Sequence, residues 1–303
     1  MSFCIAIGED GVNQNSMLQE DGRAVDDRSN AIFREGPSMR RNVNILEHQQ
    51  TIIGMLHLLP LPGAPRFNGN AHSIVEHALA DAAALAEGGV DAIMIENFGD
   101  VPFFPDKVPL ETVTWMTRIG GLIRDKHDLP LGVCVLRNDG RAALAIAHSI
   151  GAQFIRICVL GSPRVTDQGL VQATAYDILR DRARLGADIK ILADVDIKHS
   201  YPLASSFSLQ AEAADLISRS LADALIVTGT ATGLAIKRSD LSEIRGISKV
   251  PVFVGSGVTD KNIKQLSNDA NGFIIGTSFK ESNRVDARVS VDKVRAAVSQ
   301  LRG

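Results

Sequence analysis

The sequence predicts a closed (β/α)8 barrel, and three features of the chain lead to that prediction. Short apolar segments alternate with amphipathic segments of helical length from residue 51 to the end. Such alternation is typical of βα units around a parallel sheet. Eight apolar segments can be distinguished, and the last two run into loops of small residues, where barrels often bind a phosphate. An open doubly wound sheet is the competing arrangement, because alternation alone does not establish closure.

The expected strands and helices follow one another at regular spacing. We expect strands at residues 51–56, 92–96, 131–136, 154–159, 190–195, 224–228, 251–254 and 272–275. Helical periodicity indicates helices at residues 73–87, 111–126, 140–150, 171–185, 209–221, 240–245, 259–266 and 290–301. Ser73 with Glu76 has the spacing of a capping box, and Thr259 or Asp260 would cap the seventh helix.

Composition narrows the class of protein. The chain has 303 residues, of which 45% are hydrophobic, so it can bury one large core, expected over residues 46–303. Residues 1–45 are polar without apolar periodicity and are predicted to form a flexible tail. A net charge of −3 gives no basic field, so nucleic acid is not an expected partner. Base rates alone suggest a homo-oligomer.

The cysteines and the apolar segments bear on location. The three cysteines are widely spaced, odd in number and in no metal-binding pattern, which is typical of a reducing compartment. The longest uncharged stretch, residues 142–155, is too short to span a bilayer. We therefore expect a cytoplasmic protein without a transmembrane segment.

The fifth expected strand carries charged residues at alternate positions. Asp194, Asp196 and Lys198 share one face if the strand stays regular, while Val195 and Ile197 point to the other. That face would offer a carboxylate base, a metal ligand and a cation for an enolate or a phosphate. Ordinary ion pairing at the rim of the barrel is the alternative, and it applies to Lys198 as much as catalysis does.

Three further charged or titratable residues belong to the first, second and fourth strands. Arg156 interrupts an apolar strand and must find a carboxylate or an anionic ligand, because its charge cannot be shed. It would either neutralise Glu96 or Asp194 inside the barrel or bind substrate. His57, Glu96 and Asp194 are candidate ligands of a divalent metal, although their spacing is not diagnostic and a hydrogen-bonded His57 without metal is the default.

The loops after the last two strands are the predicted phosphate site. Their small residues allow the backbone to approach phosphate oxygens closely. The ligand-binding candidates are Gly255, Ser256, Gly257, Gly276, Thr277 and Ser278, together with Thr228, Gly229, Asn138 and Asp139. Asn138 and Asp139 would bind sugar hydroxyls, or Asp139 would cap the following helix. Residues 161–169 are expected to form a flexible loop, and the loop starting at Thr228 to face the ligand.

The combined motifs resemble the BtpA/SgcQ family. The match rests on residues 54–63 (GMLHLLPLPG), 89–102 (GVDAIMIENFGDVP), 136–139 (LRND), 154–156 (FIR), 167–169 (DQG), 193–195 (ADV) with Lys198 and His199, and 255–257 (GSG). The resemblance implies a TIM barrel similar to the ribulose-phosphate-binding barrels. Members of the family are named for a role in photosystem I accumulation in cyanobacteria, and related genes lie beside sugar-transport and sugar-phosphate genes. The resemblance does not identify a substrate for this chain.

Together these observations predict an enzyme acting on a phosphorylated sugar or similar small phosphate, by isomerase, epimerase or lyase chemistry. Asp194 or Glu96 would be the general base, with Asp196 or His57 as acid partner or metal ligand. Arg156 or Lys198 would stabilise negative charge. The cofactor is open: a divalent metal is one candidate, and the same loops would also suit the phosphate of FMN. A non-catalytic biogenesis or assembly factor for a membrane protein complex is the alternative function.

Overall fold

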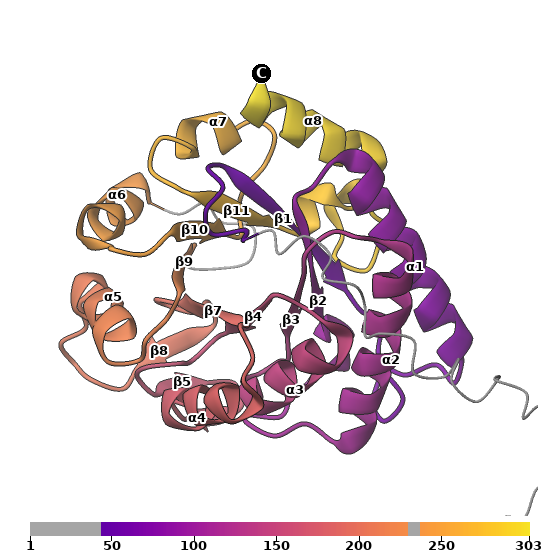
Figure 1. Ribbon diagram of the computed structural model, residues 1–303, viewed down its shortest axis with the longest axis horizontal. Coiled ribbons are helices and arrows are strands. Elements are labelled where there is room, and N and C mark those ends of the chain that lie inside the picture. Colours follow the sequence, from indigo (N-terminus) through magenta and orange to yellow (C-terminus); the bar gives the residue numbers. More distant parts are fainter. Residues whose placement is uncertain (1–43, 230–236) are drawn as a thin grey trace, which may run out of the picture. The chain divides into compact units, whose positions relative to one another are not determined.

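Eight parallel strands close into a barrel in the computed structural model, which describes residues 44–229 and 237–303. In chain order these strands are β1 (Thr51–His57), β2 (Ala92–Glu96), β3 (Leu131–Cys134), β4 (Phe154–Ile157), β7 (Lys190–Asp194), β9 (Ala224–Thr228), β10 (Val252–Gly255) and β11 (Gly272–Ile275). Each pairs with the next, and β11 pairs with β1 to close the sheet (Figure 1). The predicted barrel is confirmed, and the open-sheet alternative is wrong.

Helices surround the barrel between successive strands (Figure 1). They are α1 (Ala71–Gly88), α2 (Leu110–Lys126), α3 (Gly140–Ile150), α4 (Ala175–Leu185), α5 (Leu209–Ser218), α6 (Arg238–Ile247), α7 (Ile263–Leu266) and α8 (Val291–Arg302). Short 3-10 turns are η2 (Phe98–Asp100), η3 (Thr277–Phe279) and η4 (Glu281–Asn283). Three helices are shorter than predicted. Helix α4 begins at Ala175 because Val171 belongs to a strand, α5 ends at Ser218, and α7 is a single turn.

The helix caps agree with the sequence in one case and differ in two. Asp139 caps α3, because its Oδ1 accepts a hydrogen bond from the Ala142 N–H at 2.9 Å. The predicted Ser73 cap is wrong: α1 starts earlier, and Asn70 accepts from the Ser73 N–H at 3.1 Å. The predicted cap at Thr259 or Asp260 is also wrong, since α7 starts after Asn262 and no side chain caps it.

Alternation along the strands divides the core into two layers. In β1, Ile53 and Met55 belong to the cluster inside the barrel, whereas Ile52 and Leu56 belong to the cluster between barrel and helices. The side-chain period of a strand is two, so the inward series of β1 continues to His57 at its carboxyl end. The same rule puts the last inward residue of each strand at the mouth of the barrel, where catalytic groups of such folds lie.

A small three-stranded sheet is added to the loops that follow β4 and β7. It consists of β6 (Gly169–Val171), β5 (Arg164–Thr166) and β8 (Ser200–Pro202) in that spatial order. Arg164 ties it to the barrel: its guanidinium donates to Asp196 Oδ1 and to the Val195 carbonyl, each at 3.0 Å, and lies over the Phe207 ring. The expectation of a flexible loop over residues 161–169 is therefore wrong, because this segment forms an antiparallel hairpin.

Two predictions fall on other parts of the chain. The tail predicted for residues 1–45 lies outside the described residues except for its last two, of which Ile45 is buried. The predicted ligand-facing loop after β9 lies outside them from Thr230 onward. Among the helices of the described ranges, none is both long enough and apolar enough to cross a membrane.

Candidate functional site

A cavity of about 560 Å³ opens at the carboxyl ends of the barrel strands. Its polar lining includes His57, Glu96, Arg137, Arg156, Lys198, His199, Ser256, Thr277 and Ser278, and its apolar lining includes Met55, Phe98, Phe103 and Ile197. This volume suits a small-molecule ligand. Nine residues predicted from strand ends and loops thus meet in one place: His57, Glu96, Arg156, Lys198, Ser256, Gly257, Gly276, Thr277 and Ser278.

The loop after β10 forms one wall of the cavity and binds the ammonium group of Lys198, which follows β7. Ser256 and Gly257 adopt left-handed backbone conformations, with φ of 72° and 69°. The Lys198 Nζ reaches across to this loop and donates to Ser256 Oγ at 2.8 Å. Burial lowers the pKa of Lys198, yet no carboxylate in the described residues lies within ion-pair distance of its ammonium group. An ammonium group without a counter-ion on such a loop is suited to an anionic ligand.

The loop after β11 packs directly against His57. A Cβ on Gly276 would lie 2.7 Å from His57 Cε1, so a side chain at this position would push the imidazole aside. Ser278 Oγ donates to the Val258 carbonyl at 2.6 Å and links the two loops. Glycine at position 276 therefore allows the loop after β11 to lie directly against the His57 side chain.

His57 and Glu96 form a buried pair on adjacent strands. Their side chains are directly opposite in the β1–β2 register, with Nε2 and Oε2 3.5 Å apart. Burial, followed by the charges of Lys280, Lys198 and Arg156, lowers the pKa of His57 to about 3. The imidazole is neutral at pH 7, and its buried Nδ1 has no hydrogen-bond partner among the described residues. The Phe98 ring packs against the imidazole, with 4.9 Å between centroids and a tilt of 50°.

Arg156 joins the two carboxylates of the barrel interior. Its Nε and Nη2 donate to the two oxygens of Asp194, both at 2.9 Å, and its Nη1 lies 3.9 Å from Glu96 Oε1. The Asp194 side chain is fully buried and does not line the cavity, whereas Arg156 and Glu96 do. Both oxygens of Asp194 are thus occupied, and this carboxylate fixes the guanidinium rather than facing a ligand.

The predicted metal candidates do not form a metal site. Within residues 44–229 and 237–303 no three His, Cys, Asp or Glu side chains are placed to hold a metal ion. His57 and Glu96 are neighbours, but the Arg156 guanidinium stands between Glu96 and Asp194. A cation in that position repels a metal ion, so the donor set does not fit one.

Several predicted site residues belong to the scaffold around the cavity. Strand β7 ends at Asp194, so alternation does not continue: Asp196 pairs with Arg164 and does not line the cavity. Burial raises the pKa of Asp196. Thr228 Oγ1 donates to the Asp196 carbonyl at 2.8 Å, and Gly229, next in the chain, is not a lining residue either.

Asn138 and Asp139 are bound to backbone rather than directed at the cavity. The Asn138 amide donates to the carbonyls of Val159 and Gln172 and accepts from the Val159 N–H. Asp139 caps α3 and also accepts from the Val108 N–H. These bonds hold the loop after β3 in place. The Asn138 oxygen and both Asp139 oxygens already accept hydrogen bonds from backbone N–H groups, so they do not serve as acceptors for sugar hydroxyls.

Several lining residues had no assigned role in the sequence. Phe98 and Phe103 provide an apolar side, and Arg137 adds a third cation. Cys158 also lines the cavity, and a hydrogen bond with Cys134 lowers the pKa of its thiol. Arg137 was recognisable only as a charged residue at a strand end in the Leu-Arg-Asn-Asp segment.

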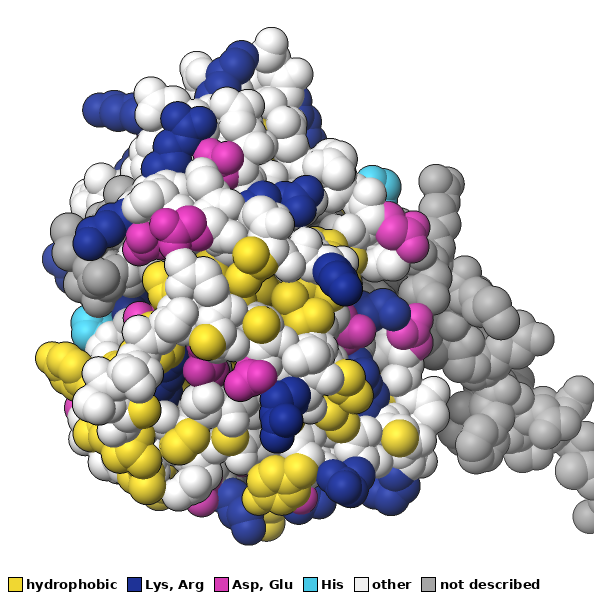
Figure 2. Space-filling model, turned by 90° about the vertical axis from the view of Figure 1, so that its left-hand side faces the viewer, with side chains coloured by type: hydrophobic (Ala, Val, Ile, Leu, Met, Phe, Trp, Pro, Cys, Tyr) yellow, Lys and Arg dark blue, Asp and Glu magenta, His cyan; other side chains and the backbone are white. Residues whose placement is uncertain are grey.

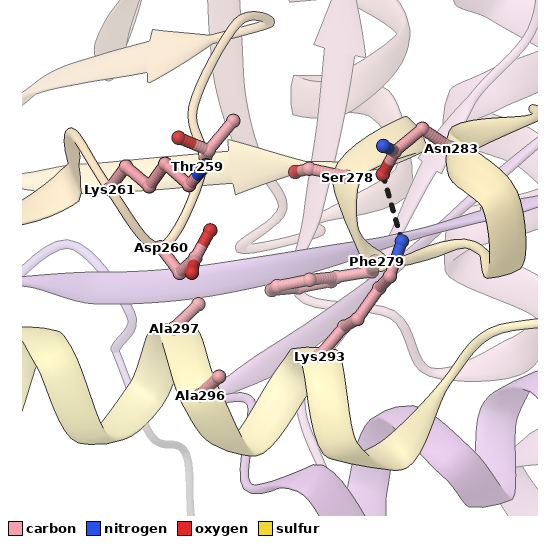
Figure 3. A pocket seen from close by; sticks show the side chains of 9 residues that line it. All are labelled: Thr259, Asp260, Lys261, Ser278, Phe279, Asn283, Lys293, Ala296 and Ala297. Carbon is pink, nitrogen blue, oxygen red and sulfur yellow. Dashed lines mark hydrogen bonds between the residues drawn. The ribbon is translucent and has the colours of Figure 1, made fainter.

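A second cavity, of about 320 Å³, lies on the outer side of the same two loops (Figure 3). It shares Thr259, Ser278 and Asn283 with the main cavity. Its most central cation, Lys293, already donates to Asn283 Oδ1 at 2.9 Å and to the Lys280 carbonyl at 2.8 Å. Ala296 and Ala297 of α8 form its floor (Figure 3). Lys293 is therefore engaged by the loop after β11, while the charged residues Asp260 and Lys261 also line this cavity.

Fold and cavity together define a (β/α)8 barrel with a cationic mouth. The chain belongs to the BtpA family, whose model matches residues 48–303. It is 42% identical over 251 residues to the photosystem I biogenesis protein BtpA of Synechocystis, covering 82% of this chain and 87% of that protein. An uncharacterized protein of Thermococcus kodakarensis is 44% identical over 250 residues, covering 82% of this chain and 94% of the relative.

Solved structures of the same fold include enzymes whose names contain a phosphorylated compound. Thiamine phosphate pyrophosphorylase from Pyrococcus furiosus matches with a TM-score of 0.52 at 14% identity, covering 86% of this chain and 96% of the other. N-(5'-phosphoribosyl)anthranilate isomerase from the same organism matches with a TM-score of 0.52 at 13% identity, covering 84% and 98%. At such low identity the likeness establishes the TIM-barrel fold alone.

Proposed function

We propose that this chain is an enzyme that acts on a phosphorylated sugar or similar small phosphate. The observation that carries the proposal is the Lys198 ammonium group, which lies on the loop of Gly255, Ser256 and Gly257 without a carboxylate partner in the described residues. The loop containing Gly276, Thr277 and Ser278 completes that side of the cavity. The fold likeness to enzymes named for phosphate compounds supports the same ligand class.

The remaining cavity residues suit proton transfer next to a carbonyl group. Glu96 is the carboxylate that faces the cavity, so we assign it as general base for a C–H proton. The neutral His57 would hydrogen-bond the carbonyl oxygen, and Arg156 would stabilise the negative charge that develops there. Asp194 then orients Arg156. Isomerisation, epimerisation and retro-aldol cleavage share this enolate chemistry, and none of these steps requires a metal.

The test of this proposal follows proton exchange in heavy water. A panel of aldose and ketose phosphates is incubated with the protein, and the C–H signals next to the carbonyl are followed by proton NMR. We expect exchange or conversion of at least one phosphate, abolished by Glu96→Gln and retained in Glu87→Gln, whose exposed carboxylate pairs with Arg295. Exchange that survives in Glu96→Gln would contradict the assignment of the base.

A second candidate function is that of an assembly factor, and the small sheet is the observation that favours it. Leu170, Val165 and Tyr201 are paired across its three strands, so their side chains form one row on one face. All three are exposed, Tyr201 to 74%. Hydrophobic side chains also gather at the lower left of the face drawn in Figure 2. Contiguous exposed apolar patches mark protein contacts on many proteins. One relative is named for photosystem I biogenesis.

One genetic comparison separates the two functions. In cells that lack this protein, the enzyme hypothesis predicts rescue by Tyr201→Lys and failure by Glu96→Gln. The assembly hypothesis predicts the opposite pattern. A homo-oligomer that buries the row would show a concentration-dependent mass in sedimentation, reduced by Tyr201→Lys.

We also propose a cytoplasmic location and a single barrel domain over residues 46–303. The two buried cysteines of the described residues, Cys134 and Cys158, are free thiols, which is usual in a reducing compartment. Fractionation of cells followed by immunoblotting checks the location, and limited proteolysis checks the domain boundary.

A further inference from the structure

Arg137 is the one cavity-lining arginine without an ion pair in the described part of the chain. The residue is buried, with 6% of its surface exposed. Its guanidinium makes one hydrogen bond to the described residues, from Nη2 to the Lys198 carbonyl at 2.7 Å. Its Nε is buried and has no hydrogen-bond partner among residues 44–229 and 237–303. A guanidinium group has five N–H donors and keeps its charge, so a buried one with an unused donor is costly unless a ligand binds there.

The position of Arg137 is fixed by its surroundings. Its backbone N–H donates to the Phe104 carbonyl at 2.9 Å. The Leu136 N–H donates to Asn97 Oδ1 at 2.7 Å, inside the buried region behind η2. These bonds fix the backbone of Arg137, and the Lys198 carbonyl holds its guanidinium at the edge of the cavity. A binding group is expected to be held in place in this way.

Arg137 lies across the mouth from the phosphate loops. It follows β3, and β3 and β10 are four strands apart in either direction around the closed barrel. Lys198 connects the two sides, because its carbonyl accepts from Arg137 and its ammonium group donates to Ser256. One lysine residue therefore spans the space between the Arg137 guanidinium and Ser256.

The charges of the cavity agree with two anionic groups on the ligand. Arg156 is compensated by Asp194 and approached by Glu96, whereas Arg137 and Lys198 have no carboxylate within ion-pair distance in the described ranges. We infer that the ligand carries a carboxylate at the end opposite its phosphate and that Arg137 binds it. This inference rests on the proposed phosphate site and deepens it: the substrate class becomes phosphorylated sugar acids. A planar guanidinium edge matches a carboxylate in shape as well as in charge.

The test compares compounds that differ only at the end opposite the phosphate. Calorimetric titrations of the full-length protein use 4-phosphoerythronate against erythritol 4-phosphate and 6-phosphogluconate against sorbitol 6-phosphate. A charge-assisted contact should make one acid bind about tenfold tighter or more than its matched alcohol. Arg137→Gln should remove this preference, while Arg141→Gln, at an exposed pair with Asp181, should keep it.

The outcomes separate this inference from the proposed function. Equal binding of acid and alcohol in both pairs, with both weakened by Lys198→Met, would overturn the carboxylate site and leave the phosphate site standing. Binding of no compound would contradict both. A preference for a hexitol 1,6-bisphosphate over 6-phosphogluconate, lost in Arg137→Gln, would also overturn the carboxylate and assign a second phosphate. If Arg137→Gln does not fold, the comparison of acid with alcohol in the unmodified protein still decides.

Discussion

Removing the Asp194 carboxylate should destabilise the protein strongly, because Arg156 would stay charged inside the barrel. The pair has side chains that are 8% and 0% exposed and shares two bonds of 2.9 Å. Loss of one partner of a buried pair typically costs 3–5 kcal/mol. Glu96 remains 3.9 Å from the guanidinium as a weaker partner, so Asp194→Ala should lie at the low end, at about 3 kcal/mol. That is a large share of the roughly 5–15 kcal/mol available to a domain.

The assay is equilibrium unfolding in urea, read by circular dichroism. Asp286→Ala serves as the control, because it removes an equally ionic but exposed pair with Arg284 and should leave the midpoint unchanged. The double variant Asp194→Leu with Arg156→Met should recover most of the loss, since apolar replacements of a buried pair are often neutral. If the unfolding free energy of Asp194→Ala lies within about 1 kcal/mol of that of the original protein, the Asp194–Arg156 pair is not a main source of stability, and Asp194 becomes a candidate base again.

Three further predictions concern the walls of the cavity and the loop behind it. The folded protein keeps His57 neutral down to about pH 3 while the unfolded chain protonates it near pH 6.5, so stability is lost as the pH falls below about 6.5. Protonation of His57 in the unfolded chain should lower the unfolding free energy by up to about 1.4 kcal/mol per pH unit as the pH falls. This contribution should be absent in His57→Gln when urea unfolding is measured between pH 6 and 4. Gly276→Ala should displace the His57 ring and cost about 1–3 kcal/mol, and unchanged melting would show that the loop yields freely. Lys280 and Asp81 form a fully buried pair, so Asp81→Ala should cost about 3–5 kcal/mol in the same assay, and a small effect would mean that water reaches Lys280.

The barrel and much of its mouth follow from local pattern. The eight strands are confirmed because each is a short apolar run between amphipathic helices, a signal that needs no long-range information. The period of two then places the last inward residue of each strand at the mouth. That rule brings His57, Glu96 and Arg156 into the cavity.

The rest of the site depends on contacts between distant residues. Asp196 was expected beside Asp194, but the strand ends there and Arg164, from a hairpin that the sequence does not reveal, binds it. Asp194 was a candidate base, but in the structure it forms an ion pair with Arg156, 38 positions away. Arg137 depends on the Lys198 carbonyl, 61 positions away. Such partners cannot be chosen from spacing in one chain.

The most direct test of the central claim measures whether the cationic mouth binds a phosphorylated small molecule. Melting temperatures are recorded for the protein and for Lys198→Met with pentose, triose and hexose phosphates, each beside its unphosphorylated sugar. A ligand at about 100 times its dissociation constant adds about 2.7 kcal/mol, which gives a readable rise. We expect the melting temperature to rise with at least one phosphate, to stay unchanged with the matched sugar, and to rise much less in Lys198→Met. No response to any phosphate, or an equal response in Lys198→Met, would contradict the central claim.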